Sequence, residues 1–286
     1  MAPSDQQEAA VRRAGVLGKP VEHSLSPVLH GAAYDALGLR WTYERVEADA
    51  ERLVEFVGGL GPEWAGLSVT MPGKRAALRV ADEVADRAEA VGAANTLVHR
   101  PDGSWFADCT DVDGVVGALR VAGGFTGGHT GLILGAGGTA VATLAAFADL
   151  GLSEATLAVR EPSRAAEALE AAERIGLRVR VERLDSITLA DAATSHDVVV
   201  STLPAGAVDP HAADLAKAAC VLDVIYHPWP TPLAEAVGVV GGRLATGLDM
   251  LLHQAFGQVE HFTGQAAPRT TMRDALAAAT GHALPL

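Results

Sequence analysis

Short apolar runs alternate with longer segments of three- and four-residue apolar spacing along most of the chain. The runs are typical of strands and the spaced segments of helices, so the alternation predicts an α/β protein. In the first part we expect strands at 14–17, 41–46, 67–72 and 95–99, and helices at 48–60, 82–91 and 112–121. A further helix is expected to begin at Pro27, with Ser26 as its cap.

Glycine pairs at 123–124 and 127–128 predict a linker to a second α/β series. There we expect strands at 130–134, 155–160, 179–184, 197–201, 220–224 and 243–245, and a helix at 139–150. Runs such as the three valines at 198–200 are typical of parallel strands covered on both faces. This part has the layout of a nucleotide-binding sheet. Residues 247–259 then predict an amphipathic helix, and Pro268 precedes a final alanine-rich one.

A glycine-rich turn connects the first strand and helix of the second series, in the run Leu-Ile-Leu-Gly-Ala-Gly-Gly-Thr-Ala at 132–140. Gly135 suits the tight turn, Gly137 lets a ligand approach the backbone, and Ala140 is small enough for strand–helix contact. The new helix would direct its first N–H groups at a phosphate. We expect the pyrophosphate at Gly135, Ala136, Gly137, Gly138 and Thr139; a turn without ligand is the alternative.

The second strand of this series ends in residues that bear on the choice of nucleotide. Arg160 and Arg164 favour NADP, because guanidinium groups bind a 2′-phosphate in bidentate fashion. Glu161 stands where an acid could hold the ribose 2′-hydroxyl of NAD. The arginines could also be solvated residues of a helix start. Together the two arginines favour NADP, and Glu161 leaves NAD open.

Composition narrows the class of partner. The net charge is −13 and no basic cluster stands out, which argues against nucleic acid or an anionic membrane. No segment approaches the roughly 20 apolar residues of a membrane helix, and polar residues 1–8 lack the features of a signal peptide. Cys109 and Cys220 have neither metal-ligand nor disulfide spacing. We therefore expect a cytoplasmic protein; a homodimer is compatible with the sequence, which does not determine the oligomeric state.

Lys74 and Asp111 are the candidate catalytic pair, because both lie at element ends that a cleft could bring together. An ammonium group beside a carbonyl oxygen can supply a proton or stabilise developing charge during reduction. A surface lysine is the alternative. Ser24 and Ser26 offer hydroxyls in a strand-to-helix loop, where they could also serve only as caps. No metal is expected, since neither His-Glu-x-x-His nor Cys-x-x-Cys occurs. Serine hydrolase chemistry lacks its Gly-x-Ser-x-Gly elbow.

Several motifs in order resemble the shikimate dehydrogenase family of the two-domain type. They are Gly18-x-Pro-x-x-His-Ser-x-Ser-Pro-x-x-His30, Val69-Thr-Met-Pro-x-Lys74, Ala94-Asn-Thr96, Thr110-Asp-x-x-Gly114, Gly-Ala-Gly-Gly at 135–138, Asp223-x-x-Tyr-x-Pro-x-x-Thr231 and Gly247-x-x-Met-Leu-x-x-Gln254. The likeness extends from about Ala14 to the final helix.

The resemblance implies an NADPH-dependent oxidoreductase of the shikimate pathway, which interconverts 3-dehydroshikimate and shikimate. It implies a substrate domain of residues 1–112 with 247–286, to which the C-terminal helices return, and a Rossmann-like NADP-binding domain of residues 113–246. Lys74 and Asp111 would be catalytic. The other implied contacts are Ser24, Ser26 and Thr70 with the substrate carboxylate, Asn95, Asp111 and Gln254 with its ring hydroxyls, Tyr226 near the substrate, and Gly247 and Met250 by the nicotinamide.

The chain departs from the family pattern at a few positions. Gly31, Ser68 and Cys109 stand where the family often has asparagine, and Val159-Arg-Glu161 replaces an Asn-Arg-Thr. Members that prefer NAD tend to carry an acid near Glu161. An NAD-dependent quinate/shikimate or aminoshikimate dehydrogenase is therefore the alternative function.

Overall fold

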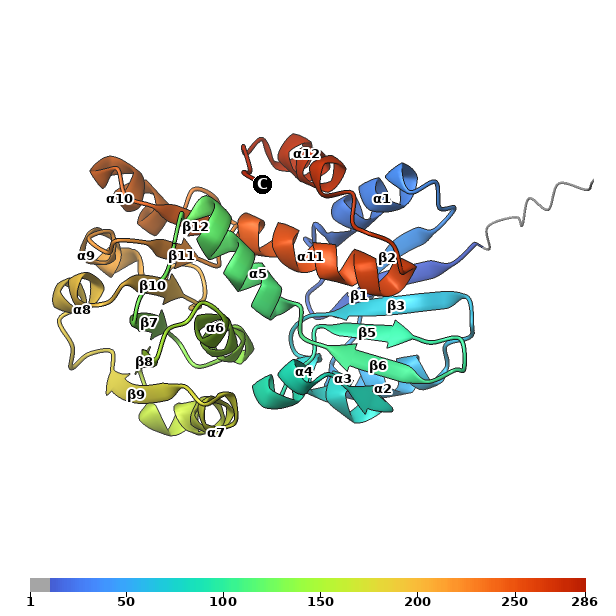
Figure 1. The fold of residues 1–286 in the computed structure, drawn as a ribbon, viewed down its shortest axis with the longest axis horizontal. Coiled ribbons are helices and arrows are strands. Elements are labelled where there is room, and N and C mark those ends of the chain that lie inside the picture. The colour runs from blue at the N-terminus through green and yellow to red at the C-terminus, as the bar shows by residue number, and fades with distance from the viewer. Residues whose placement is uncertain (1–10) are drawn as a thin grey trace, which may run out of the picture.

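Two lobes, each built on a six-stranded sheet, make up the computed structural model, which describes residues 11–286 (Figure 1). The polar residues 1–8 and the predicted domain start at residue 1 lie outside this range. The expected α/β class is confirmed, because helices and strands alternate through both lobes.

The first lobe contains a mixed sheet in the order β2-β1-β3-β5-β6-β4. β3 pairs in parallel with β1 and antiparallel with β5, and all six of its residues are buried, as a continuous apolar run predicts. The strands are β1 (Arg13–Gly18), β2 (Thr42–Glu47), β3 (Trp64–Val69), β4 (Glu83–Val84), β5 (Thr96–His99) and β6 (Trp105–Asp108). The helices are α1 (Ser26–Ala36), α2 (Ala50–Gly58), α3 (Lys74–Val80) and α4 (Asp86–Val91).

The second lobe contains a sheet in which every pair is parallel, in the order β12-β11-β10-β7-β8-β9. This is the doubly wound order of a dinucleotide-binding fold, and its strand order reverses between β7 and β10. The strands are β7 (Thr130–Leu134), β8 (Glu154–Val159), β9 (Arg178–Arg183), β10 (Val198–Ser201), β11 (Val221–Asp223) and β12 (Leu244–Thr246). The helical segments are α6 (Gly138–Asp149), η2 (Pro162–Ala165), α7 (Ala166–Ile175), α8 (Leu189–Ser195), η3 (Asp209–His211), α9 (Ala212–Leu215) and α10 (Pro232–Val240).

Helix α5 (Asp111–Gly117) leads from the first lobe into the second and continues as a π-helical turn, η1 (Ala118–Ala122). Helix α11 (Gly247–Thr263) brings the chain back, followed by α12 (Arg269–Thr280). Both return helices pack on α1, and α11 also crosses α5 (Figure 1). A Cβ on Gly117 would lie 2.2 Å from Cγ of His253, so glycine allows the close crossing of α5 and α11. The predicted return of the C-terminal helices to the first lobe is confirmed.

Two local predictions are wrong, and one helix was missed. Residues 82–91 are not one helix, because the backbone N–H groups of Asp82 and Ala85 donate to carbonyls of β6, and the short strand β4 forms before the helix begins. Ser26 does not cap α1: Leu25 precedes the helix and Ser26 is its first residue. The helix α3, which begins at Lys74, was not expected from the sequence.

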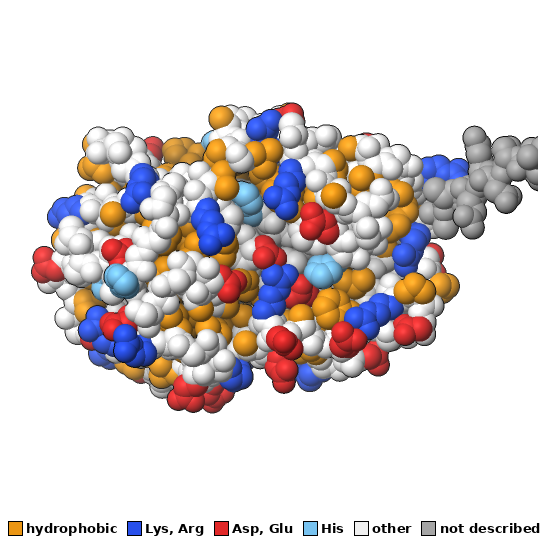
Figure 2. All heavy atoms as spheres, in the orientation of Figure 1, with side chains coloured by type: hydrophobic (Ala, Val, Ile, Leu, Met, Phe, Trp, Pro, Cys, Tyr) orange, Lys and Arg blue, Asp and Glu red, His pale blue; other side chains and the backbone are white. Residues whose placement is uncertain are grey.

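The surface shown in Figure 2 carries acidic and basic side chains interspersed over both lobes. Within residues 11–286, no helix is long and apolar enough to cross a membrane. The same residues contain no cluster of three or more histidine, cysteine or acidic side chains placed to hold a metal ion.

Candidate functional site

A cavity of about 450 Å³ lies between the lobes, within the roughly 300–1,000 Å³ typical of small-molecule sites. The first lobe contributes the segments after β1 and β3 together with the starts of α3 and α5, and the second contributes Thr139 and the segment after β11. The expected site residues on its wall are Ser24, Ser26, Thr70, Lys74, Asn95, Asp111, Thr139, Tyr226, Gly247, Met250 and Gln254. The fold thus brings residues more than 200 positions apart into one site.

Lys74 and Asp111 form an ion pair on the cavity wall, with Nζ 2.5 Å from Oδ2. Their side chains are 18% and 8% exposed. Burial lowers the pKa of Lys74, but the charge and hydrogen bond of Asp111 outweigh it and hold this pKa above its ordinary value. Asp111 begins α5, where the positive helix end also favours a carboxylate. Lys74 is therefore an ammonium group at neutral pH and can give up a proton to a ligand.

Asn95 joins this ion pair to helix α11. Its Nδ2 donates to Oδ1 of Asp111 at 2.9 Å and to Oε1 of Gln254 at 2.8 Å. Because Oε1 of Gln254 is the accepting atom, the Nε2 group of that side chain is left as a donor for the cavity it lines. The wall therefore presents an ammonium, a carboxylate and an amide donor, which together suit a ligand with several hydroxyl or carbonyl oxygens.

Three hydroxyl side chains lie on the wall of the same cavity, in the loops after β1 and β3. Ser26 is 4% exposed, and the Oγ of Ser24 accepts from its backbone N–H at 3.3 Å. Thr70 follows β3, with its backbone N–H donating to the carbonyl of Leu17. Neutral donors of this kind can bind a carboxylate without placing a second cation beside Lys74.

Asp108 anchors the loop between β6 and α5. Its carboxylate accepts two hydrogen bonds from Arg87 at 2.6 Å, one from His261 at 2.8 Å and one from the backbone of Cys109 at 2.7 Å. Burial raises the pKa of Asp108, but the His261 and Arg87 contacts hold it well below its usual range. This cluster holds the backbone that leads from β6 to Asp111 in place. It was not predicted from the sequence.

The glycine-rich turn stands at the end of β7, beside the point where the strand order reverses. Gly135 has a φ of +113°, and a Cβ there would lie 2.5 Å from Oγ1 of Thr202, so the turn needs glycine. No side chain caps α6, and a Cβ on Gly137 or Gly138 would meet no atom within 4 Å. The first N–H groups of α6 therefore remain available above open space, which fits the pyrophosphate of a dinucleotide. Ala136 lies in the same turn.

Arg160, Glu161 and Arg164 follow β8 at the surface, outside the wall of the central cavity. This is where a nucleotide's ribose would lie if its pyrophosphate bound the glycine turn. Arg183 ends the neighbouring strand β9, opposite Val159, and makes a bidentate ion pair with Asp185. Glu161 contributes to holding the pKa of Arg183 above its ordinary value, after the larger effect of Asp185. Glu161 therefore lies close enough to Arg183 for the two charges to interact.

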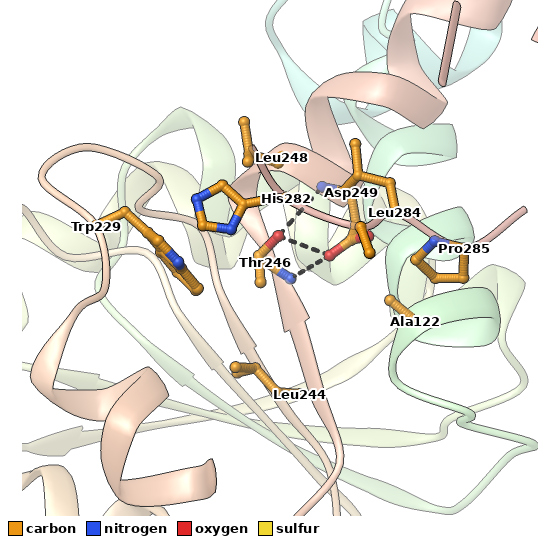
Figure 3. Close-up of a pocket in the computed structure, with 10 residues that line it drawn as sticks. Ala122, Trp229, Leu244, Thr246, Leu248, Asp249, His282, Leu284 and Pro285 are labelled. Carbon is orange, nitrogen blue, oxygen red and sulfur yellow. Dashed lines mark hydrogen bonds between the residues drawn. The ribbon is translucent and has the colours of Figure 1, made fainter. Parts of the chain in front are cut away.

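A smaller cavity of about 220 Å³ lies at the start of α11, beneath the C-terminal segment (Figure 3). Its buried carboxylate, Asp249, accepts from the backbone and the hydroxyl of Thr246 at 2.8 and 2.6 Å. The backbone N–H of Asp249 donates in return to Oγ1 of Thr246 at 3.3 Å, which completes a capping box that fixes the N-terminus of α11. Asp249 and Thr246 thus bond one another at the start of this helix.

Tyr43, Ser68 and Gln258 form a buried hydrogen-bond chain behind the cavity, and their connection was not predicted. Tyr43 donates to Ser68 at 2.6 Å, and Ser68 donates to Oε1 of Gln258 at 2.7 Å. One signal was present in the sequence: Gln258 follows Gln254 by four residues, so a second amide lies on the same face of α11.

Comparison with known proteins identifies the family of the chain. The family model of the shikimate dehydrogenase substrate binding domain matches residues 16–97, and that of the shikimate 5′-dehydrogenase C-terminal domain matches residues 247–277. A shikimate dehydrogenase (NADP(+)) of Citrifermentans bemidjiense is 38% identical over 93% of this chain and 94% of its own.

Two solved structures are also similar over nearly the whole chain. The shikimate dehydrogenase of Mycobacterium tuberculosis has a TM-score of 0.87 and 54% identity over 93% of this chain and 99% of its own. The shikimate 5-dehydrogenase of Thermus thermophilus, in complex with NADP(H) and shikimate, has a TM-score of 0.79 and 32% identity over 94% and 99%. The chain therefore belongs to the shikimate dehydrogenase family.

Proposed function

We propose that this protein catalyses the reversible, NADPH-dependent reduction of 3-dehydroshikimate to shikimate. The observation that carries the proposal is the buried ammonium–carboxylate pair of Lys74 and Asp111 on the wall of the central cavity. NADPH supplies the hydride to the carbonyl carbon when it is bound. Lys74 gives its proton to the carbonyl oxygen and Asp111 holds the ammonium group in position, so that the ketone becomes an alcohol. In the reverse direction Lys74 receives that proton.

The remaining polar residues of the wall select the substrate. Ser24, Ser26 and Thr70 bind its carboxylate through their hydroxyls, while Asn95, Asp111 and Gln254 bind the ring hydroxyls. Tyr226 lines the side from which the second lobe approaches. A site with these fixed donors and acceptors rejects an analogue that lacks a hydroxyl by roughly 10⁴-fold, because its buried polar groups would stay unpaired.

The cofactor binds across the second lobe. Its pyrophosphate lies on Gly135, Ala136, Gly137, Gly138 and Thr139 at the start of α6, and Arg160 and Arg164 bind the 2′-phosphate. Gly247 and Met250 lie by the nicotinamide, and the proposal is supported by their place on the wall of the cavity that Thr139 also lines. A Cβ on Gly247 would lie 2.1 Å from the carbonyl oxygen of Val224, so no larger residue fits there.

This assignment divides the chain into a substrate-binding domain of residues 1–112 with 247–286 and an NADP-binding domain of residues 113–246. The first boundary falls inside α5, the helix that connects the lobes. Closure of the lobes over the cavity would bring nicotinamide and ketone together.

The alternative function is an NAD-dependent quinate/shikimate or aminoshikimate dehydrogenase, and Glu161 is the observation that favours it. An exposed carboxylate beside the ribose would bind a 2′-hydroxyl and repel a 2′-phosphate. The nearby Arg160, Arg164 and Arg183 act against that repulsion, so NADP is the better supported cofactor.

Steady-state rates of the purified protein test the proposal. Shikimate oxidation is measured with NADP⁺ and with NAD⁺, and the same pair of rates is measured with quinate. We expect the highest kcat/KM for shikimate with NADP⁺. Faster turnover of quinate with NAD⁺ would establish the quinate/shikimate alternative. No turnover of shikimate with either cofactor would refute the proposed function. The cytoplasmic location and the homodimer stay predictions; light scattering of the purified protein measures the oligomeric state.

A further inference from the structure

A continuous hydrogen-bond chain runs behind the central cavity from β2 to the Lys74–Asp111 pair. Its first links are those of Tyr43 with Ser68 and of Ser68 with Gln258. Nε2 of Gln258 then donates to the backbone carbonyl of Asn95 and to Oγ1 of Thr96, both at 3.2 Å. Oγ1 of Thr96 donates in turn to Oδ1 of Asn95 at 2.9 Å. The chain connects residues up to 190 positions apart.

Two backbone groups fix the direction of every bond in this chain. The carbonyl of Asn95 can only accept, so it must face the nitrogen of Gln258 and leave Oε1 toward Ser68. The backbone N–H of Thr110 can only donate, and it lies 2.8 Å from Oδ1 of Asn95. Thr96 therefore accepts from Gln258 and has its own hydrogen free for Asn95. No hydroxyl or amide in the chain can turn over without losing a bond.

This arrangement fixes the orientation of the Asn95 side-chain amide. With Oδ1 held by Thr96 and Thr110, both hydrogens of Nδ2 point to Oδ1 of Asp111 and Oε1 of Gln254. A flipped amide would set its oxygen against these two acceptors and push both cavity groups away. Asn95, Thr96 and Gln258 are at most 2% exposed, so water cannot replace a lost partner.

Oε1 of Gln258 has a second hydrogen-bond partner on helix α1. Nε2 of His30 lies 3.3 Å from Oε1 of Gln258, and Tyr34 binds the other ring nitrogen at 3.4 Å. With Tyr34 donating to Nδ1, the imidazole carries its hydrogen on Nε2 and donates to Gln258. Burial raises the pKa of Tyr43, against smaller opposite effects of hydrogen bonds with Ser68 and Ser26.

We propose that Gln258 and Thr96 are positioning residues, which fix the amide of Asn95 and through it the geometry of Asp111 and Gln254 toward the substrate. The inference rests on the proposed function for its kinetic consequences. It does not make either residue catalytic, since neither lines the cavity.

The test uses substitutions of Thr96, because loss of the Gln258 amide could prevent folding. Thr96→Val removes the hydroxyl and Thr96→Ser retains it. We expect Thr96→Val to lower kcat/KM for shikimate about tenfold, as one misaligned hydrogen-bond partner would, with the KM for NADP⁺ unchanged. Thr96→Ser should restore most of the activity. Thr156→Val, at a buried threonine of β8 in the other lobe, is the matched control and should leave kcat/KM for shikimate unchanged.

A double-mutant cycle with Asn95→Ala separates positioning from general stability. If Thr96 and Gln258 act through the Asn95 amide, Thr96→Val and Gln258→Met should each change kcat/KM by less than about twofold in the Asn95→Ala background. Equal losses in both backgrounds would overturn the inference. Should Gln258→Met fail to fold, the Thr96 pair alone decides.

A spectroscopic measurement needs no turnover. In ¹⁵N-labelled protein, the side-chain amide hydrogens of Asn95 should exchange slowly with solvent in the wild type and in Thr96→Ser, and at least tenfold faster in Thr96→Val. Equal exchange rates in all three proteins would contradict the positioning role. A wild type that shows this pattern but never oxidises shikimate would refute the proposed function and leave the inference standing.

Discussion

The two lobes hold their halves of the site by different means. On the first lobe, side chains such as Asn95 and Asp111 are buried, and each is bonded to protein partners before any ligand arrives. On the second, the glycine turn offers backbone N–H groups above open space, and Arg160 and Arg164 stand at the surface. In the proposed assignment, substrate selection is built into a rigid network, whereas the cofactor site depends on backbone shape and on charges that solvent can screen.

Removal of the Lys74 ammonium group should have the largest effect on turnover, because it removes the proposed proton donor of the first lobe. We expect Lys74→Ala to lower kcat by about 10³-fold, within the range of lost general acid catalysis, while the Kd of shikimate changes far less. Steady-state kinetics and equilibrium titration with shikimate measure the two quantities. Lys217→Ala, at an exposed lysine of the second lobe, is the control. A weaker Kd for shikimate with an unchanged kcat would show that Lys74 only binds the substrate.

The buried network of the first lobe should also make stability depend on pH. Burial lowers the pKa of His30 to about 3, against a smaller raising effect of Gln258, whereas an unfolded histidine titrates near 6.5. Between these values the unfolded chain binds a proton that the folded chain does not, so stability falls as pH falls through this window. From pH 7 to pH 5, His30 should account for a loss of about 2 kcal/mol in the free energy of unfolding.

Urea unfolding at both pH values measures this loss. In His30→Phe the ring stack on Tyr43, 4.1 Å away in the wild type, can persist while the titration is removed. The variant should lose the His30 part of the pH dependence, and His129→Gln, at an exposed position, should retain it. Parallel pH dependences in wild type and His30→Phe would contradict the prediction.

A methyl group on the glycine-rich turn tests the proposed cofactor site of the second lobe. Gly137→Ala meets no protein atom within 4 Å, so the free energy of unfolding should stay nearly unchanged. The methyl group would, however, stand between the backbone and a pyrophosphate, and the KM for NADP⁺ should rise about tenfold, which is about 1.4 kcal/mol. Gly31→Ala on α1, equally free of contacts, should leave this KM unchanged. An unchanged KM for Gly137→Ala would place the cofactor elsewhere.

The smallest effect is expected at Glu161, where charges are exposed. Glu161→Thr removes a repulsion of the 2′-phosphate and should raise kcat/KM for NADPH by about two- to fivefold at low salt. The increase should be smaller at 0.5 M salt, because ions screen surface charges over about 10 Å already at 0.1 M. Initial rates with NADPH and NADH at the two salt concentrations measure this. Glu173→Thr on α7 should change neither rate. A fall in the NADPH rate would mean that Glu161 orders the arginines.

The sequence predicted best what depends on neighbouring residues. The strand with three valines at 198–200, the glycine turn and the helix that follows it are set by local apolar spacing and by backbone conformations that only glycine adopts. Family motifs then brought Lys74, Asp111 and Gln254 into one expected site, and the structure places all three on one cavity.

Other features could not be predicted because they depend on contacts far along the chain. Residues 82–84 have helical spacing, yet the backbone of β6, about 23 positions away, draws them into a strand. Ser26 is a residue type that often caps helices, but it is the first residue of α1 and Leu25 takes the N-cap position. The link between Ser68 and Gln258 spans 190 positions and leaves no local pattern beyond the spacing of two glutamines.

The close crossing of α5 and α11 limits which substitutions the protein can accept there. Gly114 and Gly117 face α11 so closely that a single carbon atom added to either would lie within 3 Å of it. Since α5 carries the chain from one lobe into the other, the width of the interlobe cleft is set by the absence of two side chains. A methyl group at Gly117 would press on His253, which does not line the central cavity, and would act as a wedge that alters the separation of the two lobes.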